Sequence, residues 1–353
     1  MERIGNEGPP FNKGLRGGAR RAVRVSPQAL VSEGYLEPGR SLPLVLRPAV
    51  EGLDLAAWAG ANRDEVERRL LEHGAILFRG FDVKSPAQFE RFMQAASGGA
   101  LEYGERSSPR SRVGGNIYTS TDYPPDRAIF LHNEQSYNST FPLRIVFHCR
   151  TPAAGGGETP IADTRKIFAR LPREIVERFR EKRYTYVRNF GDGFGLSWQT
   201  AFQTNERGEV EDYCRRNDIR FQWKDGGRLR TSQVRRAAAR HPRTNEAVWF
   251  NHLTFFHVST LDRDVREALL AQFAEEDLPN NTLYGDGTPV EPAVMDELRA
   301  AYLREKVSFR WERGDVLMLD NMLASHGREP YEGERSVLVG MAESLSWESV
   351  GEV

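Results

Sequence analysis

The feature that most constrains the fold is the triplet His132-Asn133-Glu134, with a second histidine, His326, near the other end of the chain. The triplet follows the apolar residues 128–131, a pattern that predicts a strand running into a loop. Because side chains alternate along a strand, His132 and Glu134 share one face. Two imidazoles and one carboxylate are the protein ligands of a non-haem Fe(II) site, which keeps further coordination positions open. A fold that uses this site must bring His326 to the triplet.

The composition narrows the class of protein. The 353 residues suffice for one large domain or two ordinary ones, with 39% hydrophobic and 28% charged residues. The net charge of −1 argues against a nucleic-acid partner. No apolar run approaches the roughly 20 residues that span a bilayer, so no membrane association is expected. Cys149 and Cys214 are the only cysteines, which argues against a disulfide framework and favours a cytoplasmic location.

The N-terminal segment differs from the rest of the chain. Residues 1–25 are rich in glycine and arginine and show no hydrophobic periodicity. They lack the apolar core of a secretory signal, and Glu2 and Glu7 do not fit a transit peptide. We expect a flexible basic arm, with a docking arm for an acidic partner as the alternative. Residues 26–353 are expected to form a single domain.

Local patterns predict the secondary structure. Strands are predicted at 42–47, 75–79, 128–132, 144–150, 184–188, 247–251, 315–320 and 336–342. Helices are predicted at 62–73 before Gly74, at 85–96 with Ser85 as N-cap, from Asp163 past Phe168, at 259–275 and at 292–306. Short strands scattered among helices, without strict β-α-β alternation, indicate an α+β fold with a largely antiparallel sheet.

A long polar segment, residues 101–127, leads directly into the strand that carries His132. Loops of this length inside a compact domain are usually functional or mobile. We therefore expect a mobile lid over the active site, with Arg110, Asn116 and Tyr118 touching the substrate.

Other polar positions are assigned less specific roles. Residues 205–230 are expected to be irregular, and the arginine-rich run 235–240 to be a solvated helix face. His241 is expected at the surface. Asn251 is a candidate to face the substrate, and His252 and His257 are candidates to line its pocket.

Four stretches carry a family resemblance: 131–137 (LHNEQSY), 155–164 (GGGETPIADT), 320–326 (DNMLASH) and 333–335 (GER). Together they resemble the taurine dioxygenase family of Fe(II)- and 2-oxoglutarate-dependent oxygenases. The chain is most similar to the clavaminate-synthase-like branch, which includes the syringomycin-type aspartyl hydroxylases. Weaker similarity extends from about Gly74 to Ala342. The resemblance implies a double-stranded β-helix, a mainly β jelly roll of two facing sheets with flanking helices.

The resemblance also implies roles for individual residues. His132, Glu134 and His326 would be the metal ligands and the catalytic centre. Thr159 would hydrogen-bond the 2-oxoglutarate carboxylate, and Arg335 would pair with its distal carboxylate, for which a guanidinium offers two parallel bonds. Where taurine dioxygenase has an arginine for the sulfonate, this chain has Val339, which speaks against a sulfonate substrate.

Coordination counting links these residues to a reaction. Three protein ligands leave room on an octahedral iron for bidentate 2-oxoglutarate and for O2. In the family, decarboxylation to succinate accompanies hydroxylation of an unactivated carbon. Family halogenases lack the carboxylate ligand, and a halide takes its place. Because this chain has Glu134 at that position, we expect that it does not halogenate. The implied substrate is an amino acid or an amino-acid derivative of specialised metabolism such as antibiotic biosynthesis, either free or tethered to a carrier protein.

Alternatives remain at this point. The same cofactors support desaturation, epimerisation or cyclisation, because substrate placement decides the outcome. Zinc also accepts two histidines and a glutamate, as in metal-dependent hydrolases, but no general base is evident. A non-catalytic binding protein on an oxygenase scaffold is the last alternative. The oligomeric state is left open.

Overall fold

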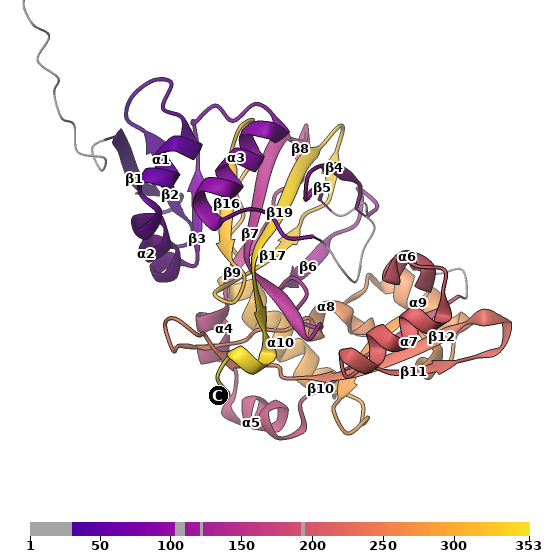
Figure 1. Ribbon diagram of the computed structural model, residues 1–353. Coiled ribbons are helices and arrows are strands. Elements are labelled where there is room, and N and C mark those ends of the chain that lie inside the picture. The colour runs from indigo at the N-terminus through magenta and orange to yellow at the C-terminus, as the bar shows by residue number, and fades with distance from the viewer. Residues whose placement is uncertain (1–29, 103–109, 121–122, 192–194) are drawn as a thin grey trace, which may run out of the picture.

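The computed structural model describes residues 30–102, 110–120, 123–191 and 195–353. Figure 1 shows two regions: a large sheet with helices on its outer side, and a second region of helices and strands at the other end. The predicted basic arm at 1–25 lies outside the described residues.

An eight-stranded sheet forms the first region. Its neighbouring strands are antiparallel, except that β2 and β3 are parallel. The strands in order are β1 (Val31–Tyr35), β2 (Leu44–Pro48), β3 (Ala75–Phe78), β16 (Val316–Asp320), β7 (Thr140–Thr151), β19 (Ser336–Ser346), β5 (Ile117–Thr119) and β4 (Arg112–Gly114). Sequence segments far apart thus lie side by side, with β7 between β16 and β19.

Three helices cover one face of this sheet: α1 (Leu55–Ala61), α2 (Arg63–His73) and α3 (Pro86–Ser97) (Figure 1). Gly74 ends α2 in the left-handed conformation, at φ 78°. The Ser85 hydroxyl accepts from the Gln88 amide and begins α3 with a capping box, an interaction typically worth about 1 kcal/mol. Both boundaries agree with the sequence prediction.

Alternating side chains give the sheet two apolar faces. Val146, Val316 and Met318 pack under the three helices. Their neighbours Phe147 and Leu317 point to the opposite side and form a separate buried cluster. That inner side is where the smaller sheets lie.

Two small antiparallel sheets complete the first region. A three-stranded sheet has the order β6 (Ile129–His132), β17 (Ala324–Arg328) and β9 (Ile161–Asp163). A two-stranded ladder pairs β8 (Gly155–Gly156) with β18 (Tyr331–Glu332).

The second region is built from residues between β9 and β16. A four-stranded antiparallel sheet has the order β11 (Arg220–Trp223), β12 (Leu229–Arg235), β10 (Tyr184–Phe190) and β15 (Asn280–Tyr284). The remaining pair is β13 (Ala239–Arg240) with β14 (Ala247–Val248). The helices are α4 (Thr164–Arg170), α5 (Arg173–Lys182), α6 (Trp198–Phe202), α7 (Arg207–Arg216), α8 (Leu253–Phe256), α9 (Arg263–Gln272) and α10 (Pro292–Glu305). Asp163 caps α4, as predicted.

Several predictions in this region are wrong. Residues 205–230 contain helix α7 and strand β11 rather than irregular chain. The run 235–240 is not a helix face, because Arg235 ends β12 and is buried. His241 is buried rather than exposed, since its Nε2 lies 3.1 Å from an oxygen of the buried Asp320. The helix predicted at 259–275 is shorter than expected and consists of α9. The strand predicted at 247–251 is also shorter and consists of β14.

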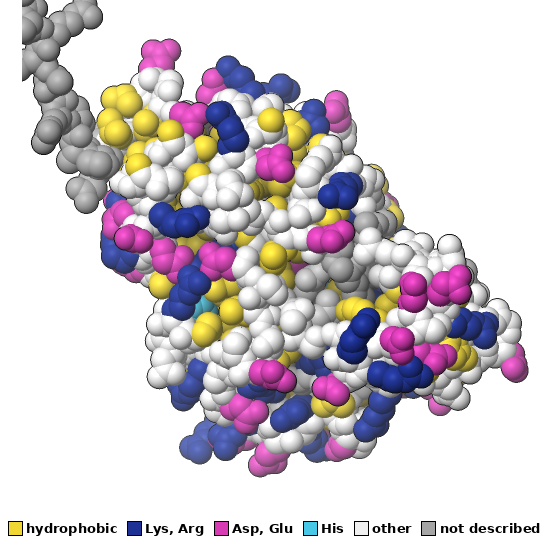
Figure 2. Space-filling view, viewed as in Figure 1, with side chains coloured by type: hydrophobic (Ala, Val, Ile, Leu, Met, Phe, Trp, Pro, Cys, Tyr) yellow, Lys and Arg dark blue, Asp and Glu magenta, His cyan; other side chains and the backbone are white. Residues whose placement is uncertain are grey.

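Acidic and basic side chains are mixed over the face seen in Figure 2. Among the described residues, no helix is both long and apolar enough to cross a membrane.

Candidate active site

The two small-sheet strands β6 and β17 bring the predicted metal ligands together. His132 ends β6 and lies directly opposite His326 of β17, and Glu134 follows in the turn after β6. One ligand atom from each of the three side chains lies within 4.8 Å of the others. All three residues are buried.

Burial and one hydrogen bond prepare the imidazoles to bind a metal. The Nδ1 of His132 lies 2.8 Å from the Phe130 carbonyl, so it carries the proton and leaves the Nε2 lone pair available. Burial lowers the pKa of His132, although the Glu134 carboxylate offsets part of this. Burial lowers the pKa of His326 well below its usual range. Both rings are therefore neutral near pH 7, which is the form that coordinates metals.

An asparagine from the far end of the chain holds the turn after β6. Asn321 accepts from the Glu134 amide at 2.8 Å and donates to the Glu134 carbonyl at 2.9 Å. Asn133 donates to the Asn321 carbonyl at 2.6 Å. These bonds fix the backbone on either side of Glu134. The sequence analysis did not assign a role to Asn321, although it lies within the resemblance at 320–326.

Aromatic rings surround the triad. Phe255 stacks on His132 at 4.9 Å between centroids, and His252 lies 4.6 Å from the same ring. Phe147 contacts His326 at 5.2 Å. His252, one of the two pocket candidates, is therefore beside the triad, whereas His257 bonds Ser259 in the next turn.

Arg110 brings a positive charge into the site. Its Nη2 donates to Glu134 Oε2 at 2.7 Å, and both side chains are buried. The His326 Nε2 lies 3.8 Å from the same carboxylate oxygen. Of the lid residues predicted to touch the substrate, Arg110 is thus in direct contact with the candidate metal site.

The other substrate candidates have structural partners. Asn116 donates to the Ala100 carbonyl at 2.9 Å and accepts from Arg112. Tyr118 is buried in β5 within the cluster that contains Phe147. Asn251 donates to the Ala237 carbonyl and accepts from the Leu253 amide, so both of its polar side-chain atoms are engaged. Within the predicted lid, the short strands β4 and β5 belong to the large sheet.

Thr159 and Arg335 form a second polar group. Arg335 Nη2 lies 3.4 Å from the Thr159 hydroxyl, and Trp311 also donates to that oxygen, at 3.1 Å. Arg335 further bonds the Gly157 carbonyl and the Ser120 hydroxyl. Among the described residues it has no carboxylate partner. Burial, with the nearby charge of Arg328, lowers the pKa of Arg335 to about 10.

These contacts fit a divalent metal and a dicarboxylate. The triad offers two neutral imidazoles and one carboxylate, the donor set of a non-haem Fe(II) site. The Arg335 guanidinium is partly buried and its hydrogen bonds go only to neutral acceptors, so an anion bound there would balance its charge.

The comparisons with known proteins identify the family. Residues 40–342 match the model of the taurine catabolism dioxygenase TauD, TfdA family. The chain belongs to this family. It is therefore a dioxygenase, and the prediction of Fe(II), 2-oxoglutarate and O2 as its reacting groups is confirmed at the level of the family.

Individual relatives agree with this assignment. The dapdiamide synthesis protein DdaC of Enterobacter agglomerans is 41% identical over 311 residues, which cover 85% of this chain and 94% of that protein. A clavaminate synthase-like protein of Arabidopsis thaliana is 28% identical over 316 residues, covering 86% of this chain and 91% of that protein. The chain thus spans nearly the full length of both relatives.

Solved structures show the fold. PvcB of Pseudomonas aeruginosa matches with a TM-score of 0.50 at 17% identity, covering 95% of this chain and 98% of that one. AAD-2, solved with Mn(II) and N-oxalylglycine, matches with a TM-score of 0.51 at 14% identity, covering 92% of this chain and 99% of that one.

Proposed function

We propose that this dioxygenase hydroxylates an unactivated carbon of an amino acid or amino-acid derivative in specialised metabolism, such as antibiotic biosynthesis. The observation that carries the metal chemistry is the buried His132, Glu134 and His326 triad. The relative that supports the substrate class is DdaC, a dapdiamide synthesis protein. The substrate is either free or tethered to a carrier protein. Family membership favours this function over a hydrolase or a binding protein.

The residues take the following roles in the proposal. His132, Glu134 and His326 hold Fe(II), which together with 2-oxoglutarate supplies the activation of O2. Arg335 pairs with the distal carboxylate of 2-oxoglutarate, and Thr159 donates its hydroxyl to that cosubstrate. Arg110 orients Glu134 and faces the substrate. We further propose that the large and small sheets of the first region are the two halves of a double-stranded β-helix.

The cosubstrate site can be tested by visible spectroscopy without oxygen. Adding Fe(II) and 2-oxoglutarate together is expected to give a weak charge-transfer band that neither gives alone. Arg335→Lys keeps the charge but loses the planar fork, so 2-oxoglutarate binding should weaken about tenfold while metal binding persists. Arg310→Lys, at an exposed arginine, is the control and should match the wild type.

Two outcomes would contradict the proposal. If the band is absent while the metal still binds, bidentate binding of 2-oxoglutarate to the iron is ruled out. If Arg335→Lys binds 2-oxoglutarate as tightly as the wild type, Arg335 does not bind the cosubstrate.

Substrate class is tested by mass spectrometry after aerobic turnover with free and with carrier-bound amino acids. We expect a gain of one oxygen atom, coupled to succinate formation. A loss of two hydrogens instead would favour desaturation or cyclisation, and an unchanged mass with inverted stereochemistry would favour epimerisation.

A further inference from the structure

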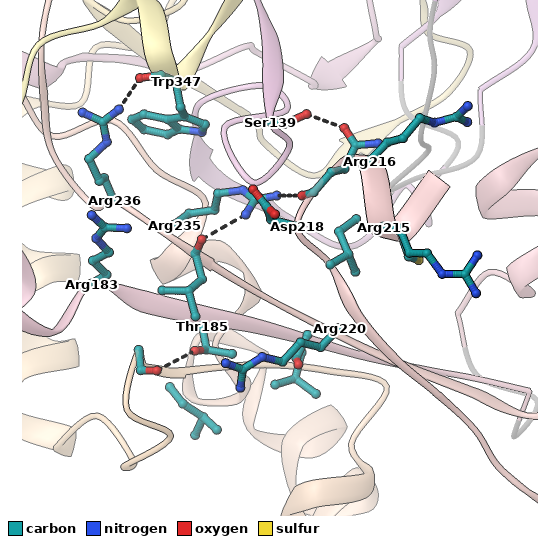
Figure 3. Close-up of a pocket in the computed structure, with 18 of the residues that line it drawn as sticks. Ser139, Arg183, Thr185, Arg215, Arg216, Asp218, Arg220, Arg235, Arg236 and Trp347 are labelled. Atoms are coloured by element: carbon teal, nitrogen blue, oxygen red, sulfur yellow. Dashed lines mark hydrogen bonds between the residues drawn. The ribbon is translucent and has the colours of Figure 1, made fainter. Parts of the chain in front are cut away.

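A large groove lies on the outer face of the four-stranded sheet (Figure 3). Thr185 and Val187 of β10 line it. Tyr184 and Tyr186, which alternate with them, point to the opposite side, where Tyr186 stacks on Phe256 at 4.0 Å. His252, beside the metal triad, also stacks on Phe256. The sheet therefore separates the groove from the candidate active site.

The groove has an excess of positive charge. Seven arginines line it, against four acidic residues and no lysine, so the lining carries a formal excess of three positive charges. The arginines are Arg183, Arg215, Arg216, Arg220, Arg230, Arg235 and Arg236. The chain as a whole carries a net charge of −1, so this concentration is local.

One end of the groove already holds a carboxylate. Glu352, from the C-terminal segment, places Oε1 3.7 Å from both Arg183 Nη2 and Arg236 Nη1. A single carboxylate oxygen thus lies between two guanidinium groups. The lining therefore already contains one carboxylate paired with arginine.

On the other side, Arg215 is already paired with Glu211 and Asp212, but two neighbouring arginines have no such partner among the described residues. Arg216 and Arg220 form no side-chain ion pair or hydrogen bond with any residue that the structure describes. Arg220 lies opposite Ser232 in the sheet register, and Arg230 precedes Ser232 by two residues on the same face. Such diagonal neighbours lie about 7–8 Å apart, where like charges are unfavourable unless an anion lies between them. Arg230 donates to the Glu276 carbonyl, which is neutral.

The arrangement fits an extended partner better than a small anion. The groove has a volume of about 1030 Å³, at the upper end of the range of about 300–1,000 Å³ that is common for small-molecule sites and far larger than one small anion needs. Figure 3 shows Arg183 and Arg236 on one side, Arg215 and Arg216 on the other, and Arg220 below. The guanidinium groups surround the groove and do not converge on one point. An α-helix with its side chains is roughly 10–12 Å across, a scale that suits such a spread of charge.

We propose that this arginine-lined groove docks an acidic protein partner, through a helix that carries Asp and Glu side chains along one face. The carboxylates of the partner continue the row that Glu352 begins, and they pair with Arg216 and Arg220. This docking surface is independent of the oxygenase reaction, because the two sites lie on opposite faces of the sheet.

The test uses the full-length protein and a fluorescent helical peptide with glutamates on one face. Its binding is measured by fluorescence anisotropy at two salt concentrations. A peptide of the same length with glutamine at those positions is the matched probe. The glutamate peptide is expected to bind, more weakly at high salt because the contacting charges are exposed. The glutamine peptide should not bind.

Reversing the charge of two groove arginines tests whether the peptide binds in the groove. The double variant Arg216→Glu/Arg220→Glu should weaken peptide binding about tenfold or more. The control is Arg173→Glu/Arg263→Glu, whose side chains are 90% and 83% exposed outside the groove, and it should bind like the wild type. Thermal melting verifies that both variants fold.

Three results would overturn the proposal. The first is no binding of the glutamate peptide to the wild type at low salt. The second is equal binding by both double variants. The third is complete competition by inorganic phosphate or pyrophosphate at concentrations comparable to the peptide, which would assign the groove to a small anion.

Discussion

Arg110 places a positive charge in direct contact with a proposed metal ligand, Glu134. A nearby cation opposes the binding of a second cation in a buried site, where charge interactions are strong. The variant Arg110→Met should therefore bind Mn(II) more tightly than the wild type, by about tenfold. Arg110→Lys retains the charge and should bind Mn(II) with nearly the wild-type affinity.

Titration of the protein with Mn(II), followed by electron paramagnetic resonance, measures this difference without turnover. Equal Mn(II) affinities in Arg110→Met and the wild type would show that Arg110 does not influence the metal. If Arg110 also faces the substrate, the KM of the substrate should rise in both variants while succinate formation without substrate continues.

Among the helices and strands, those with strong local signals were predictable. Helices α2 and α3 have caps and a 3.6-residue apolar period, both of which are local properties. Strand β12 has the opposite character, since its buried positions are Leu229, Thr231, Gln233 and Arg235. Three of these four residues are polar. The strand therefore alternates buried and partly exposed positions, but its sequence does not alternate apolar and polar residues. Their hydrogen bonds to distant segments, such as Arg235 to the Tyr137 carbonyl, cannot be read from the sequence.

The β8–β18 ladder lies beside Arg335, the proposed cosubstrate residue, and its close strand pairing depends on a glycine. Gly156 has φ +66°, and a Cβ there would lie 2.1 Å from the Pro330 carbonyl oxygen. Gly156→Ala should therefore push β18 away and displace Arg335 from Thr159. We expect 2-oxoglutarate binding to weaken about tenfold, with Mn(II) binding nearly unchanged.

Gly155→Ala is the matched control for this variant. A Cβ at Gly155 would meet only Glu332 Oε2, at 4.0 Å. Calorimetric titration with 2-oxoglutarate in the presence of Mn(II) compares the two proteins. Similar affinities in both variants would show that the ladder does not position Arg335.

Across the molecule, the sequence predicted the residues that belong to a recognisable motif but not those that support them. The structure brings His132, Glu134 and His326 together, and it places Thr159 beside Arg335. The motif signals those residues because the proposed chemistry needs their side chains. Asn321 acts through backbone groups of the turn after β6, a contact that only the tertiary fold creates. Asn251 was a candidate for the substrate, but its polar atoms bond the backbone instead.

A buried charge network joins distant parts of the chain and makes stability depend on pH. Asp320 on β16 pairs with Arg144 on β7 and with His241, and Arg144 also bonds Glu67 of α2. Burial by itself would raise the pKa of Asp320, but Arg144 and His241 outweigh it and lower the pKa to about 2. The folded state thus favours the ionised carboxylate more than the unfolded chain does, by roughly 2 kcal/mol.

Because the folded-state pKa is below the unfolded value, this stabilisation is present above about pH 4 and is lost as the pH falls toward 2. Asp320→Asn should lower the free energy of unfolding at neutral pH, since Arg144 then keeps a buried charge with one partner fewer. It should also flatten the decline between pH 4 and pH 2. Asp264→Asn removes an exposed carboxylate and should leave both nearly unchanged. Chemical denaturation across this pH range measures the effect. If the free energy of unfolding of Asp320→Asn falls as steeply between pH 4 and pH 2 as that of the wild type, other carboxylates cause this decline. The network around Asp320 would then contribute to stability at neutral pH alone.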